Sequence, residues 1–78
     1  MYHRIRLLKD HLADVRLPGK ARLEQLMLRA GETFEAHVRP FIKETPRGPV
    51  ECANLYLPSG ETLLGLRMRC FTFNDEND

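Results

Sequence analysis

The sequence contains no tryptophan, only two cysteines and no long hydrophobic segment. Its longest uninterrupted hydrophobic run covers the four residues 63–66, whereas a helix that crosses a membrane needs about 20. The first six residues include a histidine and two arginines, unlike the hydrophobic centre of a secretory signal. We therefore expect a cytoplasmic protein that does not enter a membrane.

Motifs for catalysis and cofactor binding are missing as well. The single serine, Ser59, stands in a Pro-Ser-Gly turn and not in the Gly-x-Ser-x-Gly motif of a nucleophilic serine. Cys52 and Cys70 have neither Cys-x-x-Cys spacing nor the spacing of zinc ligands. No glycine-rich phosphate-binding loop is present. The sequence predicts a protein that is not an enzyme, binds no cofactor and keeps two reduced thiols.

The residues that are present indicate a small globular domain. Of 78 residues, 42% are hydrophobic and 29% are charged, which is typical of a folded chain and too hydrophobic for a disordered one. We expect one domain over residues 1–73 and a disordered acidic tail at residues 74–78. A chain of this length buries only about 60–65% of its surface on folding, and oligomerisation is one way to compensate.

Two helices are predicted in the first part of the chain, because hydrophobic residues recur there at intervals of three and four. The first would cover residues 4–16, with a hydrophobic face made of Ile5, Leu8, Leu12 and Val15. The second would cover residues 20–30, with a face made of Leu23, Leu26, Met27 and Ala30. Pro18 and Gly19 would separate the helices, and Gly31 would end the second.

Histidine and aspartate on the first helix raise the question of a metal site. His3, Asp10 and Asp14 would share one helix face, and imidazole and carboxylate groups bind zinc and harder divalent ions. His3 and Asp10 would lie about 10 Å apart along an axis that rises about 1.5 Å per residue. One ion cannot bridge that gap, so a solvated helix face is the better interpretation and no metal is expected.

Beyond Glu32 the hydrophobic period changes to two, which predicts a strand over residues 33–42. Pro40 has no N–H group, so it should lie at a sheet edge or at the end of this strand. Residues 43–49 are expected to form a loop. The resulting fold class is α+β: two antiparallel N-terminal helices packed on a small antiparallel sheet of about three strands, which ends in a long β-hairpin.

That hairpin is predicted over residues 50–73. The segment Leu-Pro-Ser-Gly-Glu at residues 57–61 fits a three-residue loop with a left-handed glycine at Gly60. Partner numbers would then sum to 118, so that Cys52 faces Leu66. Cys70 would lie about 13 Å farther along the strand than the partner of Cys52, which is too far for a disulfide.

This register places hydrophobic side chains on both faces of the hairpin. The helices can cover one face, whereas the other needs the 33–42 strand to curl over it, or a second protein chain. Soluble monomers seldom expose large hydrophobic patches. We therefore predict a surface that binds another copy or another subunit. Its residues would be Leu28, Leu55, Leu57, Leu63, Phe71 and Phe73.

The charge distribution supports an alternative function. Residues 1–29 hold seven Lys or Arg against three acids, net +4, and residues 30–78 hold five against eight, net −3, which gives the total of +1. Two basic helices before a hairpin follow the order of a winged helix-turn-helix and could contact phosphates. A third helix and exposed aromatic residues are missing. The candidate nucleic-acid-binding residues are Arg4, Arg6, Lys9, Arg16, Lys20, Arg22 and Arg29.

The sequence therefore favours a non-catalytic protein-interaction or regulatory module, as a homodimer or as a small subunit of a complex. Nucleic-acid binding is the alternative, and a small enzyme or metal-binding protein is a second one. If the partner surface is correct, Leu55→Asp or Phe73→Asp should dissociate the oligomer and leave the fold intact.

Overall fold

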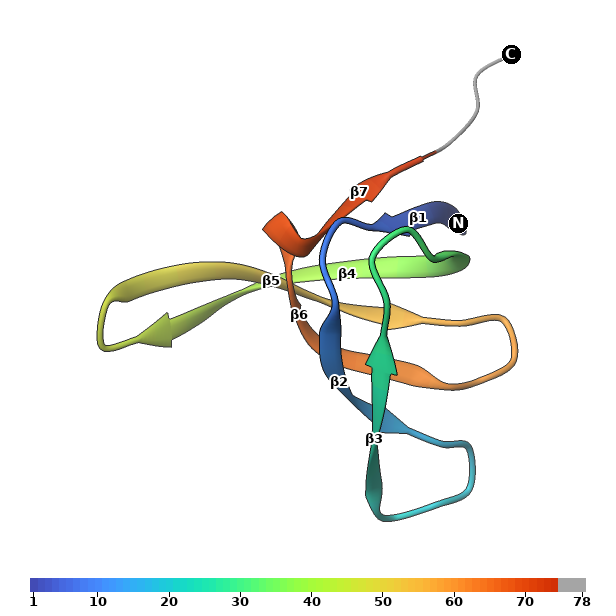
Figure 1. Cartoon of the computed structure of the whole chain (residues 1–78). Helices are drawn as coiled ribbons and strands as arrows, with labels where there is room; N and C mark the ends of the chain where they lie inside the picture. Colours follow the sequence, from blue (N-terminus) through green and yellow to red (C-terminus); the bar gives the residue numbers. More distant parts are fainter. Residues whose placement is uncertain (75–78) are drawn as a thin grey trace.

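The computed structural model describes residues 1–74 and consists mainly of β-strands (Figure 1). Strands account for 65% of these residues, and the described part of the chain contains no α-helix. The strands are β1 (His3–Leu7), β2 (His11–Arg16), β3 (Leu23–Leu28), β4 (Thr33–Thr45), β5 (Gly48–Tyr56), β6 (Thr62–Arg67) and β7 (Phe71–Phe73). A short 3-10 helix, η1 (Met68–Cys70), separates β6 from β7.

All seven strands belong to one antiparallel sheet with the order β3-β2-β6-β5-β4-β1-β7. β1 and β2 are consecutive in the chain, yet β6, β5 and β4 lie between them in the sheet. Because only residues 8–10 join β1 to β2, the sheet must curl until its two sides approach each other. The result is a half-barrel, in which β1 and β7 lie above β2 and β3 in the view of Figure 1.

The hydrophobic core fills the concave side of this curled sheet. Its central side chains come from strands in both halves of the strand order. Ile5, Leu7, Leu55 and Leu66 are all but inaccessible to solvent. Ala13, Val15, Leu28, Ala36, Ala53, Leu63 and Phe71 complete the buried cluster. Strands that are distant in the sequence therefore depend on each other for burial.

The predicted α+β class is wrong, because both predicted helices are β-strands. Residues 4–16 form β1, a turn and β2. Leu8 and Leu12, two members of the supposed helical face, are half exposed, and the buried residues instead alternate along each strand. The turn at residues 8–10 interrupts this alternation without changing its phase, because the buried positions are 5 and 7 in β1 and 13 and 15 in β2. The helix-like spacing arises because Leu8 in the turn and Leu12 on the outward face of β2 are hydrophobic although they are exposed. Two short strands with a turn between them therefore imitate the three- and four-residue spacing of one helix.

The second predicted helix, residues 20–30, contains the edge strand β3. Three of its supposed face residues, Leu23, Leu26 and Met27, are about half exposed. Gly31 follows the strand and belongs to the turn that leads into β4. The glycine signal therefore marked the end of an element correctly but could not distinguish a strand from a helix.

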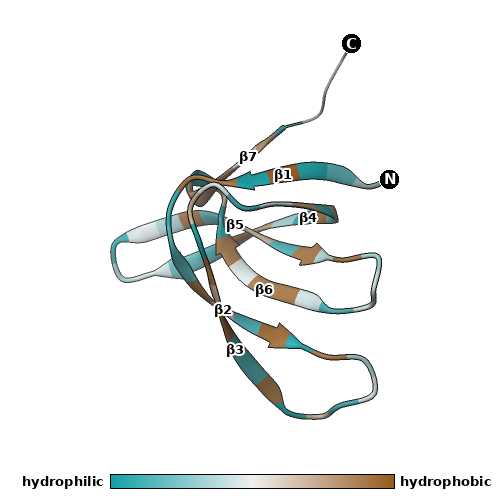
Figure 2. Ribbon diagram, turned by 45° about the vertical axis from the view of Figure 1, so that its right-hand side comes forward, coloured by the Kyte–Doolittle hydropathy of each residue, from teal (hydrophilic) through white to brown (hydrophobic). Residues whose placement is uncertain are grey.

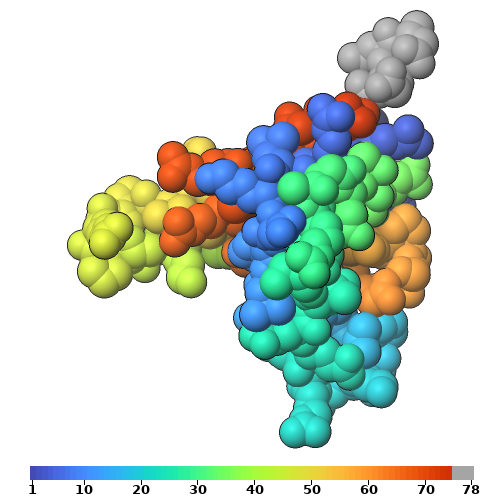
Figure 3. All heavy atoms as spheres, viewed as in Figure 1, coloured from blue at the N-terminus to red at the C-terminus, as the bar shows by residue number. Residues whose placement is uncertain are grey.

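The predicted strand at residues 33–42 is confirmed and extends to Thr45. The predicted loop at residues 43–49 is wrong, because only Pro46 and Arg47 lie between β4 and β5. Pro40 occupies a part of β4 that pairs with β5 alone, since β1 covers only residues 33–36 of β4. Because β6 pairs with β5 only from Cys52 onward, residues 42–51 form a two-stranded arm, which projects from the body of the molecule (Figures 1 and 3).

The hairpin formed by β5 and β6 keeps the predicted register only near its turn. Leu57 donates its backbone N–H to the carbonyl of Glu61 at 2.9 Å, and Leu55 faces Leu63 as predicted. A bulge then shifts the register by one, so Cys52 faces Arg67 and not Leu66. The predicted second hairpin strand also ends early, because η1 redirects the chain and β7 pairs with β1.

The predicted acidic tail falls mostly outside the described residues, because the description ends at Asn74. Asn74 donates its backbone N–H to the carbonyl of Arg4 at 2.7 Å. This bond continues the pairing of β7 with β1 by one residue.

Candidate interaction surfaces

The structure places most of the predicted partner-binding residues inside the core of a single chain. Leu28, Leu55, Leu63 and Phe71 are buried. Leu57 is partly buried and packs against the core. Only Phe73 is exposed, and its ring meets the His3 ring edge-on at a centroid distance of 5.2 Å. Curling of the sheet, and not a second chain, covers the hydrophobic faces of the hairpin.

The edge strand β3 exposes more large hydrophobic side chains than any other described strand. It pairs with β2 on one side and, within residues 1–74, has no strand on the other. Its side chains Leu23, Leu26 and Met27 remain 48%, 51% and 44% exposed, and β3 lies at the surface in Figure 3. Proteins usually protect such an edge with proline, lysine or a bulge. β3 has none of these, and Glu24 is its single charged residue.

β3 presents hydrophobic side chains on both of its faces. Along β3, hydrophobic residues stand before and after the hydrophilic pair Glu24 and Gln25 (Figure 2). The pairing with β2 places Met27 opposite Leu12, which is also half exposed, on the convex face of the sheet. Leu26 points to the concave side with Ala13 as its neighbour. A covering layer on one face alone would therefore not remove this strand from water.

A shallow hollow of about 240 Å³ lies beside β3 on the concave side of the sheet. Buried Val15 and Leu63 contribute to its lining, and Leu26 lies at the β3 edge. The hydrophobic lining is completed by Leu17 and Leu57, and the polar lining consists of Glu24, Gln25 and Glu61. The core is thus incompletely closed at the same edge that lacks a strand partner.

The seven basic residues of the nucleic-acid alternative lie on several elements. Arg4 and Arg6 are on β1, and Lys9 is in the following turn. Arg16, Lys20 and Arg22 lie near the loop that joins β2 to β3, and Arg29 follows β3 at the strand's other end. Arg29 approaches Asp10 to 3.5 Å. The fold brings three of these residues to one hairpin end but does not assemble all seven on one strand or loop.

The residues that could support catalysis or metal binding are also dispersed over the fold. Cys52 and Cys70 are free and buried. The hydroxyl of Ser59 donates to the carboxylate of Glu61 within the hairpin turn. Within residues 1–74, no three His, Cys, Asp or Glu side chains gather as a metal site would require. The same part of the chain has no helix with the length and hydrophobicity to span a membrane.

Comparisons with protein families, with curated proteins and with solved structures give no match to this chain. The candidate surfaces therefore rest on the chain's own geometry.

Proposed function

We propose that this protein is a non-catalytic cytoplasmic interaction module that forms a homodimer through β3. The observation that carries the proposal is the edge strand itself, which has no neighbour on one side among the described residues and exposes Leu23, Leu26 and Met27. A second β3 would supply hydrogen-bond partners for the free edge of the strand. It would also cover hydrophobic groups on both faces of the sheet, which a flat partner on one face could not do.

A two-fold axis at Gln25 gives the most favourable register for this pairing. Antiparallel strands then place Leu23 of one copy opposite Met27 of the other, twice by symmetry. Gln25 faces its own counterpart, and side chains directly opposite each other lie on the same face of the sheet. A slip by one residue in one direction would place Arg22 opposite Arg29 of the other copy, and like charges in that position are destabilising.

The hollow beside β3 favours the same arrangement. In the proposed register, Leu26 of the second copy lies opposite Glu24 on the concave side. The side chain of that second Leu26 would then reach the rim of the hollow, where Leu57 and Leu63 contribute to the lining. The pairing of two edges would thus extend the hydrophobic core of each chain into the interface.

Sedimentation velocity at several protein concentrations tests the dimer. The wild type should sediment as a dimer, and Leu23→Glu/Met27→Glu should be a monomer because each new carboxylate faces another across the axis. Leu23→Glu/Met27→Lys should recover the dimer, since opposite charges would then face each other. Ile42→Glu is the control, because Ile42 is similarly exposed at 56% but lies on the arm.

Two results would contradict the proposal. One is a wild type that sediments as a monomer at every concentration. The other is a dimer that survives in the Leu23→Glu/Met27→Glu variant while circular dichroism shows an intact β fold.

A further inference from the structure

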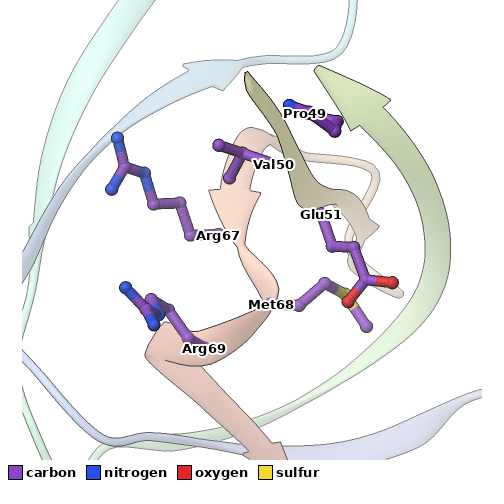
Figure 4. Close-up of a pocket in the computed structure, with 6 residues that line it drawn as sticks. All are labelled: Pro49, Val50, Glu51, Arg67, Met68 and Arg69. Atoms are coloured by element: carbon purple, nitrogen blue, oxygen red, sulfur yellow. The ribbon is translucent and has the colours of Figure 1, made fainter. Parts of the chain in front are cut away.

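Another unpaired strand edge runs along the β5 side of the arm. β6 pairs with β5 as far as the pair Cys52–Arg67 and then turns away into η1. In the described part of the chain, residues 48–51 of β5 therefore have β4 on one side and no strand on the other. The departure of β6 opens a notch of about 460 Å³ between the two segments (Figure 4). Cavities of about 300–1,000 Å³ are typical of ligand sites.

The notch has a defined lining. One wall is formed by the unpaired edge of β5 and the other by the end of β6 and the start of η1. The lining residues are Pro49, Val50, Glu51, Arg67, Met68 and Arg69. A polypeptide that entered here would continue the line of β6 beside β5, over about 13 Å at 3.3 Å per residue.

The two arginines give the notch its charge. Figure 4 shows the side chains of Arg67 and Arg69 extending to the same side, whereas Glu51 extends to the opposite side beside Met68. Within residues 1–74, neither guanidinium group has a hydrogen-bond or ion-pair partner. Guanidinium groups bind carboxylates with two parallel hydrogen bonds. An incoming acidic segment would therefore meet two free cationic groups next to a free strand edge.

We infer that the notch binds an extended acidic segment of a partner polypeptide as an additional strand beside residues 48–51. Strand addition supplies main-chain hydrogen bonds, and flanking side chains supply specificity. The unpaired edge of β5 favours a polypeptide over a nucleic acid, which has no backbone amides to pair with it. The lining also lacks an aromatic side chain on which bases could stack. This site is separate from the β3 edge and does not depend on dimer formation.

Fluorescence anisotropy with a labelled peptide of eight alternating aspartates and valines tests the inference. The wild type should bind it, and the corresponding asparagine–valine peptide should bind at least about tenfold more weakly because charge-assisted hydrogen bonds are lost. Arg67→Gln/Arg69→Gln should lose about tenfold in affinity for the acidic peptide. Arg39→Gln/Arg47→Gln removes the same charge from residues outside the notch lining and should bind like the wild type.

The inference is overturned if both double variants lose affinity equally, since net charge alone would then explain binding. It is also overturned if the two peptides bind equally, or if a labelled oligouridylate binds the notch and the acidic peptide does not. Sedimentation of Arg67→Gln/Arg69→Gln separates this site from the β3 dimer. The variant should keep the oligomeric state of the wild type even where peptide binding is lost.

Discussion

Asn54 and Gly65 are joined across the β5–β6 hairpin, where the side-chain oxygen of Asn54 accepts the backbone N–H of Gly65 at 2.9 Å. This bond lies at the point where the strand register shifts by one residue. The shift gives Arg67 the position opposite Cys52 and so determines where β6 ends beside β5. The notch with Arg67 and Arg69 thus depends on a bulge that the turn sequence does not reveal.

Gly65→Ala should destabilise the protein by about 1 kcal/mol. Gly65 has a φ of +68°, a left-handed conformation that costs a residue with a Cβ atom about 1–2 kcal/mol. The space around the added methyl group is open, so the cost is conformational and not steric. Urea denaturation followed by circular dichroism measures it. Gly65→Asn should cost less, because asparagine tolerates this conformation, and an equal cost for both variants would contradict the explanation.

Gly60→Ala should cost more than Gly65→Ala. Gly60 also has a positive φ, of +103°, and an added Cβ would lie 2.9 Å from Cγ of Pro18 in the β2–β3 loop. Strain and overpacking together predict a loss of about 2–4 kcal/mol. In the double variant Gly60→Ala/Pro18→Ala the steric part should disappear. Additive effects of the two substitutions in urea denaturation would show that this contact does not contribute.

Asp10→Ala should destabilise the β1–β2 turn by about 1 kcal/mol, the typical net value of one hydrogen bond. The Asp10 carboxylate accepts the backbone N–H of Ala30 at 2.8 Å and thereby joins this turn to the end of β3. Arg29→Gln should have a smaller effect, because the Arg29–Asp10 ion pair is exposed and such pairs contribute little. Thermal denaturation compares the two variants. A larger loss for Arg29→Gln would assign the stabilisation to the ion pair.

Leu55→Asp should unfold the protein, whereas Phe73→Asp should leave it folded. Leu55 is fully buried, and Phe73 is 47% exposed on β7. An aspartate at residue 55 would place a charge in the core without a partner, which costs far more than a small domain can tolerate. Circular dichroism and the dispersion of NMR amide signals distinguish the two results. A folded Leu55→Asp variant would contradict the burial of this residue.

Nucleic-acid binding, if it occurs, should be weak and sensitive to salt. The β2–β3 hairpin end carries three of the seven basic residues, Arg16, Lys20 and Arg22, and binding through so few phosphate contacts weakens as salt rises. Gel shifts with mixed DNA and RNA should show no complex at about 150 mM salt, near physiological ionic strength. If a complex forms at about 150 mM salt and is lost in the Arg16→Glu/Arg22→Glu variant, the end of the β2–β3 hairpin binds nucleic acid.

The two candidate sites, the β3 edge and the notch, could not be predicted from the sequence, whereas the local turns could. The three hydrophobic residues Leu26, Met27 and Leu28 stand in succession, and so short a run fits a helix as well as a strand. The sequence therefore did not mark β3 as an exposed edge. The notch had no signal in the sequence either. It exists because β6 leaves β5 after Arg67 and because the arm extends past that point.

The sequence by itself determined the local features of the chain: the three-residue turn at 57–61, the strand that begins at Thr33 and the hairpin that follows. These depend on turn residues and on an alternation that neighbouring residues express. Only the tertiary structure decided that the first 30 residues are strands. β1 pairs with β4 and β7, and β2 pairs with β6, all of them distant in the sequence. The same spacing of leucines is compatible with one helix or with two short strands. The strands form because they bury their hydrophobic residues against those distant partners.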